Sequence, residues 1–126
     1  MDDLGRLQGR WRVTALEIDD QALPEAAIAE AEIHVEGETF TALGMGAVYS
    51  GRLTVDVTAD PRRFSLIFAD GPEVGSVNFG IYELDEDRWR FCINMTGHAA
   101  PAAFATTPGS NCALETLERI QPNLPA

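Results

Sequence analysis

The sequence contains no lysine, so all nine of its basic residues are arginines, and 20 acidic residues outnumber them. The resulting formal net charge of -11 repels phosphate backbones and anionic membrane surfaces. The chain also lacks any run of about 18 apolar residues, and its first ten residues, MDDLGRLQGR, do not have the basic and then apolar order of a signal peptide. We therefore expect a cytoplasmic protein that neither binds nucleic acid nor inserts into a membrane.

Cysteine and histidine are equally scarce, with two of each: Cys92, Cys112, His34 and His98. Two cysteines are too few for the disulfide framework of a small secreted domain, and the four residues do not have the spacing of a zinc site. We interpret both cysteines as reduced thiols, although a bridge between neighbouring strands stays open. No serine, cysteine or histidine lies in a catalytic motif, so we expect no metal and no cofactor and assign no catalytic residue.

What the chain does contain is a repeated alternation of apolar and polar residues, broken by turn residues roughly every 8–12 positions. At 126 residues it is long enough for one domain, covering 1–126 with a frayed tail at 121–126. The alternation predicts a first strand over Gly9–Asp19, a last strand over Cys112–Ile120, and six more between them. These six have apolar positions at Ile33 and Val35; Phe40 and Ala42; Tyr49 to Val57; Phe64 to Phe68; Val77 to Ile81; and Trp89 to Met95.

Together these strands predict an all-β protein, an eight-stranded antiparallel up-and-down barrel. Closing the sheet removes the edge strands that would otherwise pair with other chains. One short helix is expected near residues 24–31, because Pro24 suits a first helical position and Glu25 the first turn. The first strand carries Trp11, Val13 and Ala15 on one face, and its apolar phase slips at Leu16 and Ile18, which predicts a bulge there.

The glycine and tryptophan at Gly9 and Trp11 suggest a structural role at the closed end of this barrel. An indole from the first strand can fill the end of a small barrel, and the preceding glycine allows the chain to approach closely. Arg119 lies near the end of the last strand, which neighbours the first strand in a closed sheet. We therefore expect its guanidinium to stack on Trp11.

This G-x-W opening with a late arginine resembles the lipocalins and the wider calycin barrels. Over nearly the whole chain, four stretches resemble an uncharacterised bacterial lipocalin-like domain family that is abundant in planctomycetes: LQGRWRVTALEIDDQALP, AEIHVEGETF, GIYELDEDRWRFC and FATTPGSNCALETLER. The family often has Arg-Pro before the late phenylalanine, where this chain has Ala100 and Pro101. The resemblance implies a bacterial protein with a lipocalin-like fold. It supplies no catalytic residue.

Aromatic side chains on the apolar phase of the strands are the feature with functional potential. We expect them to face inward and to form a ligand-binding wall: Phe40, Tyr49, Phe64, Phe68, Phe79, Trp89 and Phe91. The polar phase, with Asn78, Tyr82, Arg90 and Asn94, is expected to face outward, and a slip of one residue in register would exchange the two sets.

Three functions remain open at this point. The favoured one is the binding of a small apolar molecule in the barrel mouth. The first alternative is an acidic interaction or scaffold module whose core is filled by the aromatic rings, with a protein partner or a second copy of the chain. The least favoured is a cofactor-free cyclase or isomerase that uses the apolar cavity to orient its substrate.

Overall fold

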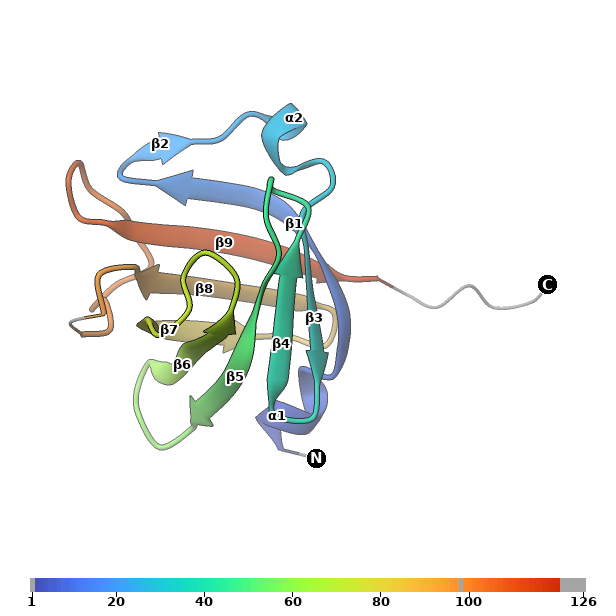
Figure 1. Cartoon of the computed structure of the whole chain (residues 1–126). Coiled ribbons are helices and arrows are strands. Elements are labelled where there is room, and N and C mark those ends of the chain that lie inside the picture. The colour runs from blue at the N-terminus through green and yellow to red at the C-terminus, as the bar shows by residue number, and fades with distance from the viewer. Residues whose placement is uncertain (1, 98, 121–126) are drawn as a thin grey trace.

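The computed structural model describes residues 2–97 and 99–120 and confirms the predicted fold class, a closed eight-stranded antiparallel barrel (Figure 1). The elements in chain order are α1 (Asp3–Arg6), β1 (Gly9–Ile18), β2 (Gln21–Ala22), α2 (Glu25–Ile28), β3 (Glu32–Glu36), β4 (Thr39–Leu43), β5 (Tyr49–Asp56), β6 (Arg62–Asp70), β7 (Val77–Leu84), β8 (Arg88–Asn94) and β9 (Cys112–Arg119). The frayed tail predicted at 121–126 lies outside the described residues.

The barrel is built from β1 and β3 to β9, each paired antiparallel with the next in this order. It closes because β1 also pairs with β9, from Trp11 opposite Arg119 to Ile18 opposite Ala113. The short strand β2 pairs only with the end of β1 and lies outside the ring. Every long strand thus has a hydrogen-bonded neighbour on both sides, which leaves no free sheet edge in the ring.

Three local predictions need correction. The helix predicted over 24–31 is a single turn, α2, and Pro24 precedes it as the N-cap residue. The first turn of the chain forms a second helix, α1, which the strand pattern did not reveal; the Asp2 side chain caps it by accepting a hydrogen bond from the Gly5 N–H at 2.8 Å. The bulge predicted at Leu16 lies between Val13 and Ala15, so Ala15 points outward and is exposed.

The predicted orientation of β7 is wrong. Phe79 is 38% exposed on the outer face, whereas Asn78 and Tyr82 are 7% and 1% exposed and point inward. The physical reason is that part of the outer face of β7, around Ile81, is covered as well. Ile81, on the outer face, packs in a second apolar cluster with Cys92, Cys112 and Phe104, and Phe104 belongs to the segment between β8 and β9. Both faces of β7 therefore carry apolar residues, and the sequence pattern does not show which face points into the barrel.

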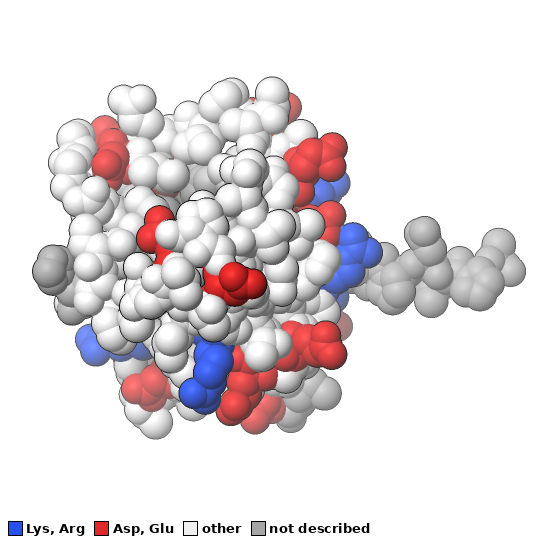
Figure 2. All heavy atoms as spheres, viewed as in Figure 1, with Lys and Arg blue, Asp and Glu red and all other residues white. Residues whose placement is uncertain are grey.

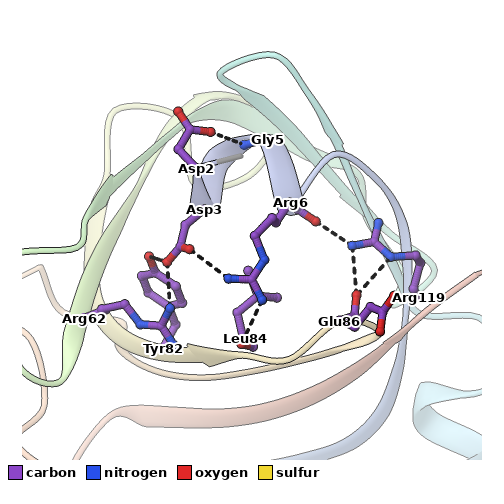
Figure 3. A network of polar contacts seen from close by, with 9 residues as sticks. All are labelled: Asp2, Asp3, Gly5, Arg6, Arg62, Tyr82, Leu84, Glu86 and Arg119. Atoms are coloured by element: carbon purple, nitrogen blue, oxygen red, sulfur yellow. Dashed lines mark hydrogen bonds and ion pairs between the residues drawn. The ribbon is translucent and has the colours of Figure 1, made fainter.

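One end of the barrel is covered by α1 (Figures 1 and 3), and Trp11 fills the interior beneath it. Trp11 is fully buried, and its indole N–H donates to the Leu7 carbonyl at 2.8 Å. The Arg119 guanidinium lies over the Trp11 ring, 4.3 Å from its centroid, and donates to the Gln8 carbonyl at 2.7 Å. Arg119 thereby fixes both the ring and the segment that leads into β1.

A buried carboxylate anchors α1 to the strands at this end (Figure 3). Asp3 accepts hydrogen bonds from the Tyr82 hydroxyl at 2.6 Å, from Arg62 at 2.9 Å and from Arg6 at 3.2 Å. Burial raises the pKa of Asp3, but the Tyr82 hydrogen bond and the charges of Arg62 and Arg6 outweigh it and leave the pKa below its ordinary value. These contacts keep this end shut, so any opening into the barrel lies at the opposite end.

Candidate functional site

A cavity of about 290 Å³ lies inside the barrel and opens at the end opposite α1. Strands from the whole ring contribute to its wall, and most of the lining side chains are apolar. Its deeper part includes Leu16, Phe40, Leu66 and Phe91, and Met45 and Met95 lie at its mouth, where they are about 40% exposed. The volume is near the lower end of the range found for small-molecule sites, about 300–1,000 Å³.

Four of the seven aromatic residues predicted to form a binding wall line this cavity: Phe40, Tyr49, Phe68 and Phe91. The Phe68 ring meets Phe40 and Tyr49 edge to face, with centroids 5.4 and 6.0 Å apart. These rings come from four strands, β4, β5, β6 and β8, and the three from β4, β5 and β6 form one aromatic cluster in the wall.

The other three aromatic residues lie elsewhere. Phe64 and Trp89 are buried deeper, in the closed half of the barrel, where Trp89 meets Trp11 edge to face at 5.7 Å. Phe79 lies on the outer face of β7, as described above. The core is therefore filled by aromatic rings near α1 and hollow near the mouth.

Sequence reasoning missed the most distinctive residue of the cavity, Glu115. It lies on the inner face of β9, between Ala113 and Leu117, and pairs laterally with Leu16 of β1 and Phe91 of β8. Within the described residues, its carboxyl group has no hydrogen bond or ion pair. The residue is partly exposed, and it lines the cavity.

Burial raises the pKa of Glu115 to about 7, and no neighbouring charge or hydrogen bond offsets this effect. At neutral pH the carboxyl group is thus divided between its protonated and ionised forms. Such a group can donate or accept a hydrogen bond, pair with a cation, or exchange a proton with a bound molecule.

The sequence did carry a signal for Glu115. Once Arg119 is placed on the inner face to reach Trp11, the period of two along a strand places Leu117, Glu115 and Ala113 on that face as well. A carboxylate on an inward phase is rare unless it has a partner or a function.

Asn78 is a second polar side chain without a partner in the cavity. It is 7% exposed, lies opposite Leu66 of β6, and makes no side-chain hydrogen bond to any described residue. Two other acidic residues border the cavity. Glu73 is exposed in the turn before β7, and Glu32 directs its carboxylate to Arg10 at 2.9 Å and His34 at 2.8 Å.

The two cysteines and the described histidine, His34, do not line this site. Cys92 and Cys112 are free thiols, buried in the outer apolar cluster, and burial raises the pKa of Cys92 to about 11, which disfavours the reactive thiolate. His34 is half-exposed on the outer face, and His98 lies outside the described residues. Among the residues that the structure describes, no three acidic, cysteine or histidine residues lie close enough together to hold a metal ion.

The fold and site together define a small closed β-barrel with a mainly apolar cavity, in which the inward-facing carboxyl group of Glu115 has no partner among the described residues. No family model matches the chain, and searches of curated proteins and of solved structures found no similar protein. In the described part of the chain, no helix has the length and apolar character needed to span a membrane.

The stability of the protein is expected to report the raised pKa of Glu115. Because the folded state holds this proton more tightly than the unfolded chain, Glu115 destabilises the fold as pH rises from its ordinary pKa of 4.5 through about 7. The stability of Glu115→Gln relative to the natural protein should therefore increase by about 1–3 kcal/mol between pH 5 and pH 8. Urea denaturation at both pH values measures this difference. The matched variant Glu73→Gln, at an exposed site, should show little change, and an equal change in both variants would contradict the assignment.

Proposed function

We propose that the protein binds a small, mainly apolar molecule in the mouth of its barrel. The observation that carries this proposal is the hollow, open half of the interior, with an aromatic and aliphatic wall and few polar groups. Protein cores are normally packed without such spaces, and an apolar cavity gains free energy when an apolar ligand fills it.

The contrast between the two ends of the barrel supports this proposal. Near α1 the interior is filled by Trp11, Trp89 and Phe64, whose rings contact one another. In the open half, several of the side chains that border the cavity are small, among them Ala42 and Ala113. A chain that needed only a filled core could place larger residues at these positions, as it does at the closed end.

We also propose that the chain is related to the lipocalin-like barrels that its sequence resembles, and that it acts in the cytoplasm. The closed eight-stranded ring and the Trp11–Arg119 contact at its closed end support the relationship. The two free thiols, Cys92 and Cys112, support the location, because thiols stay reduced in the cytoplasm.

The test uses N-phenyl-1-naphthylamine, an apolar fluorophore that is uncharged at neutral pH. It should bind with a stoichiometry of about one and raise the melting temperature, because a ligand at 100 times its Kd adds about 2.7 kcal/mol to stability. Isothermal calorimetry and differential scanning fluorimetry measure both effects.

A matched pair of variants locates the site. Ala42→Phe places a ring inside the cavity and should abolish binding, whereas Val57→Phe enlarges a side chain that is 54% exposed beyond the end of β5 and should not. Binding that survives Ala42→Phe, or a natural protein that binds no fluorophore, would overturn the proposal.

A further inference from the structure

The polar groups that border the cavity are all acidic or neutral. Besides Asn78, they are the carboxylate residues Glu32, Glu73 and Glu115 and the hydroxyl group of Tyr49; no arginine or described histidine lines the cavity. The chain as a whole carries a net charge of -11, and acidic side chains outnumber basic ones on the face shown in Figure 2. The interior of the barrel therefore favours cations and repels anions.

Among the residues that the structure describes, none supplies a counter-charge to Glu115. The two flanking strands present Leu16 and Phe91 to it, and its neighbours along β9 are Ala113 and Leu117. A carboxylate in such surroundings costs free energy to ionise unless it is paired, and the described residues contain no partner for it. A ligand that brings a positive charge would supply the missing partner.

A second observation points to a ligand in the same cavity. Asn78 is more than nine-tenths buried, yet its amide has no hydrogen bond to any described residue. Buried amides normally have such partners, and this one borders the cavity. Its carbonyl oxygen, like the carboxylate of Glu115, accepts hydrogen bonds from an N–H group.

We propose that the ligand is an apolar amine, whose hydrocarbon part contacts the aromatic wall and whose ammonium group pairs with Glu115. This inference rests on the proposed function and specifies its ligand class. An ammonium group donates three hydrogen bonds and forms a charge-assisted bond with a carboxylate, which makes it the complement of the groups present. A fatty acid of the same size would instead bring a second negative charge beside Glu115.

The pairing predicts how affinity changes with pH. An alkylamine with a pKa of about 10 stays charged up to pH 8, so Glu115 is the group that titrates in this range. Its charge is lost below its pKa of about 7, so affinity should fall by about thirtyfold from pH 8 to pH 5.5, following the ionised fraction of the carboxyl group. The other acidic groups at the cavity are Glu73, which is exposed at the mouth, and Glu32, which is paired with Arg10 and His34 on β1 and β3. Tyr49 on β5 is the remaining titratable residue of the wall.

The experiment compares three ligands of equal chain length, octylamine, 1-octanol and octanoate, by isothermal calorimetry at pH 8 and pH 5.5. Octylamine should bind at least tenfold more tightly than the other two at pH 8, and this preference should be lost at pH 5.5. Glu115→Gln should lower the affinity for octylamine to that for 1-octanol and remove the pH dependence. Glu36→Gln is the matched control: it changes an exposed carboxylate at the end of β3 that does not line the cavity, and it should retain the preference for the amine.

The fluorophore separates failure of this inference from failure of the proposed function. If N-phenyl-1-naphthylamine binds but 1-octanol or octanoate equals octylamine, or if Glu115→Gln leaves the octylamine affinity unchanged, the amine assignment is overturned and the apolar site remains. If neither the fluorophore nor octylamine binds, both are overturned. Retained fluorophore binding by Glu115→Gln shows that the variant is folded and its cavity intact.

Discussion

Replacing Trp11 by alanine is expected to lower the free energy of unfolding by about 3–5 kcal/mol, the usual cost of removing a large aromatic side chain from a core. The ring is fully buried and meets Trp89 edge to face, so its removal leaves a hole at the closed end. It also removes the partner of the Arg119 guanidinium and the donor to the Leu7 carbonyl. Urea denaturation followed by circular dichroism measures the loss.

Two further variants keep this prediction testable. Trp11→Phe retains a ring but not the N–H group, and it should fold with a smaller loss of about 1–3 kcal/mol. Phe79→Ala removes an aromatic side chain that is 38% exposed on the outer face and should cost much less than Trp11→Ala. Equal losses at Trp11 and Phe79 would show that Trp11 has no special structural role.

Gly51→Ala is expected to cost about 3 kcal/mol or more, at the upper end of the range for overpacking a core. A Cβ atom at this position would lie 1.8 Å from the Ile67 carbonyl oxygen and 2.9 Å from the Ala69 nitrogen. These atoms belong to the neighbouring strand β6, at the point where the register of β5 and β6 shifts. The backbone cannot yield without separating the two strands.

Gly37→Ala is the control for this substitution. Gly37 has a positive φ of 62°, but a Cβ there meets nothing within 4 Å. Its cost should be limited to the strain of the left-handed conformation, about 1–2 kcal/mol. Thermal and urea denaturation of both variants compare the two effects; a smaller loss for Gly51→Ala than for Gly37→Ala would be inconsistent with the close strand contact.

The barrel was predictable because its signal recurs along the whole chain. Alternation in β1, β6, β8 and the other long strands identifies each of them, and closure follows from their number and antiparallel order. The contact of Trp11 with Arg119 was also predictable, because a closed ring makes the first and last long strands neighbours.

The remaining errors arise where a residue has neighbours that the local sequence does not reveal. Phe79 and Tyr82 stand on opposite faces of β7, and the outer face is covered around Ile81 by the segment that contains Phe104. Alternation reports which residues share a face, and tertiary packing decides which face is inside. Glu115 was missed for a related reason. Its charge favours an outward position, and only its even spacing from Arg119 along β9 indicates that it points inward.

The pairing of β1 with β9 also determines when the candidate site comes into existence. β9 follows all the other strands along the chain, and it contributes Glu115 to the cavity and Arg119 to the closed end. Until β9 joins β1, the sheet has two open edges, the Trp11 ring lacks its cation, and the cavity lacks its carboxyl group. The binding that we propose thus requires the most distant segments of the sequence to have met, so a ligand of this cavity would report complete folding and would stabilise only the closed barrel.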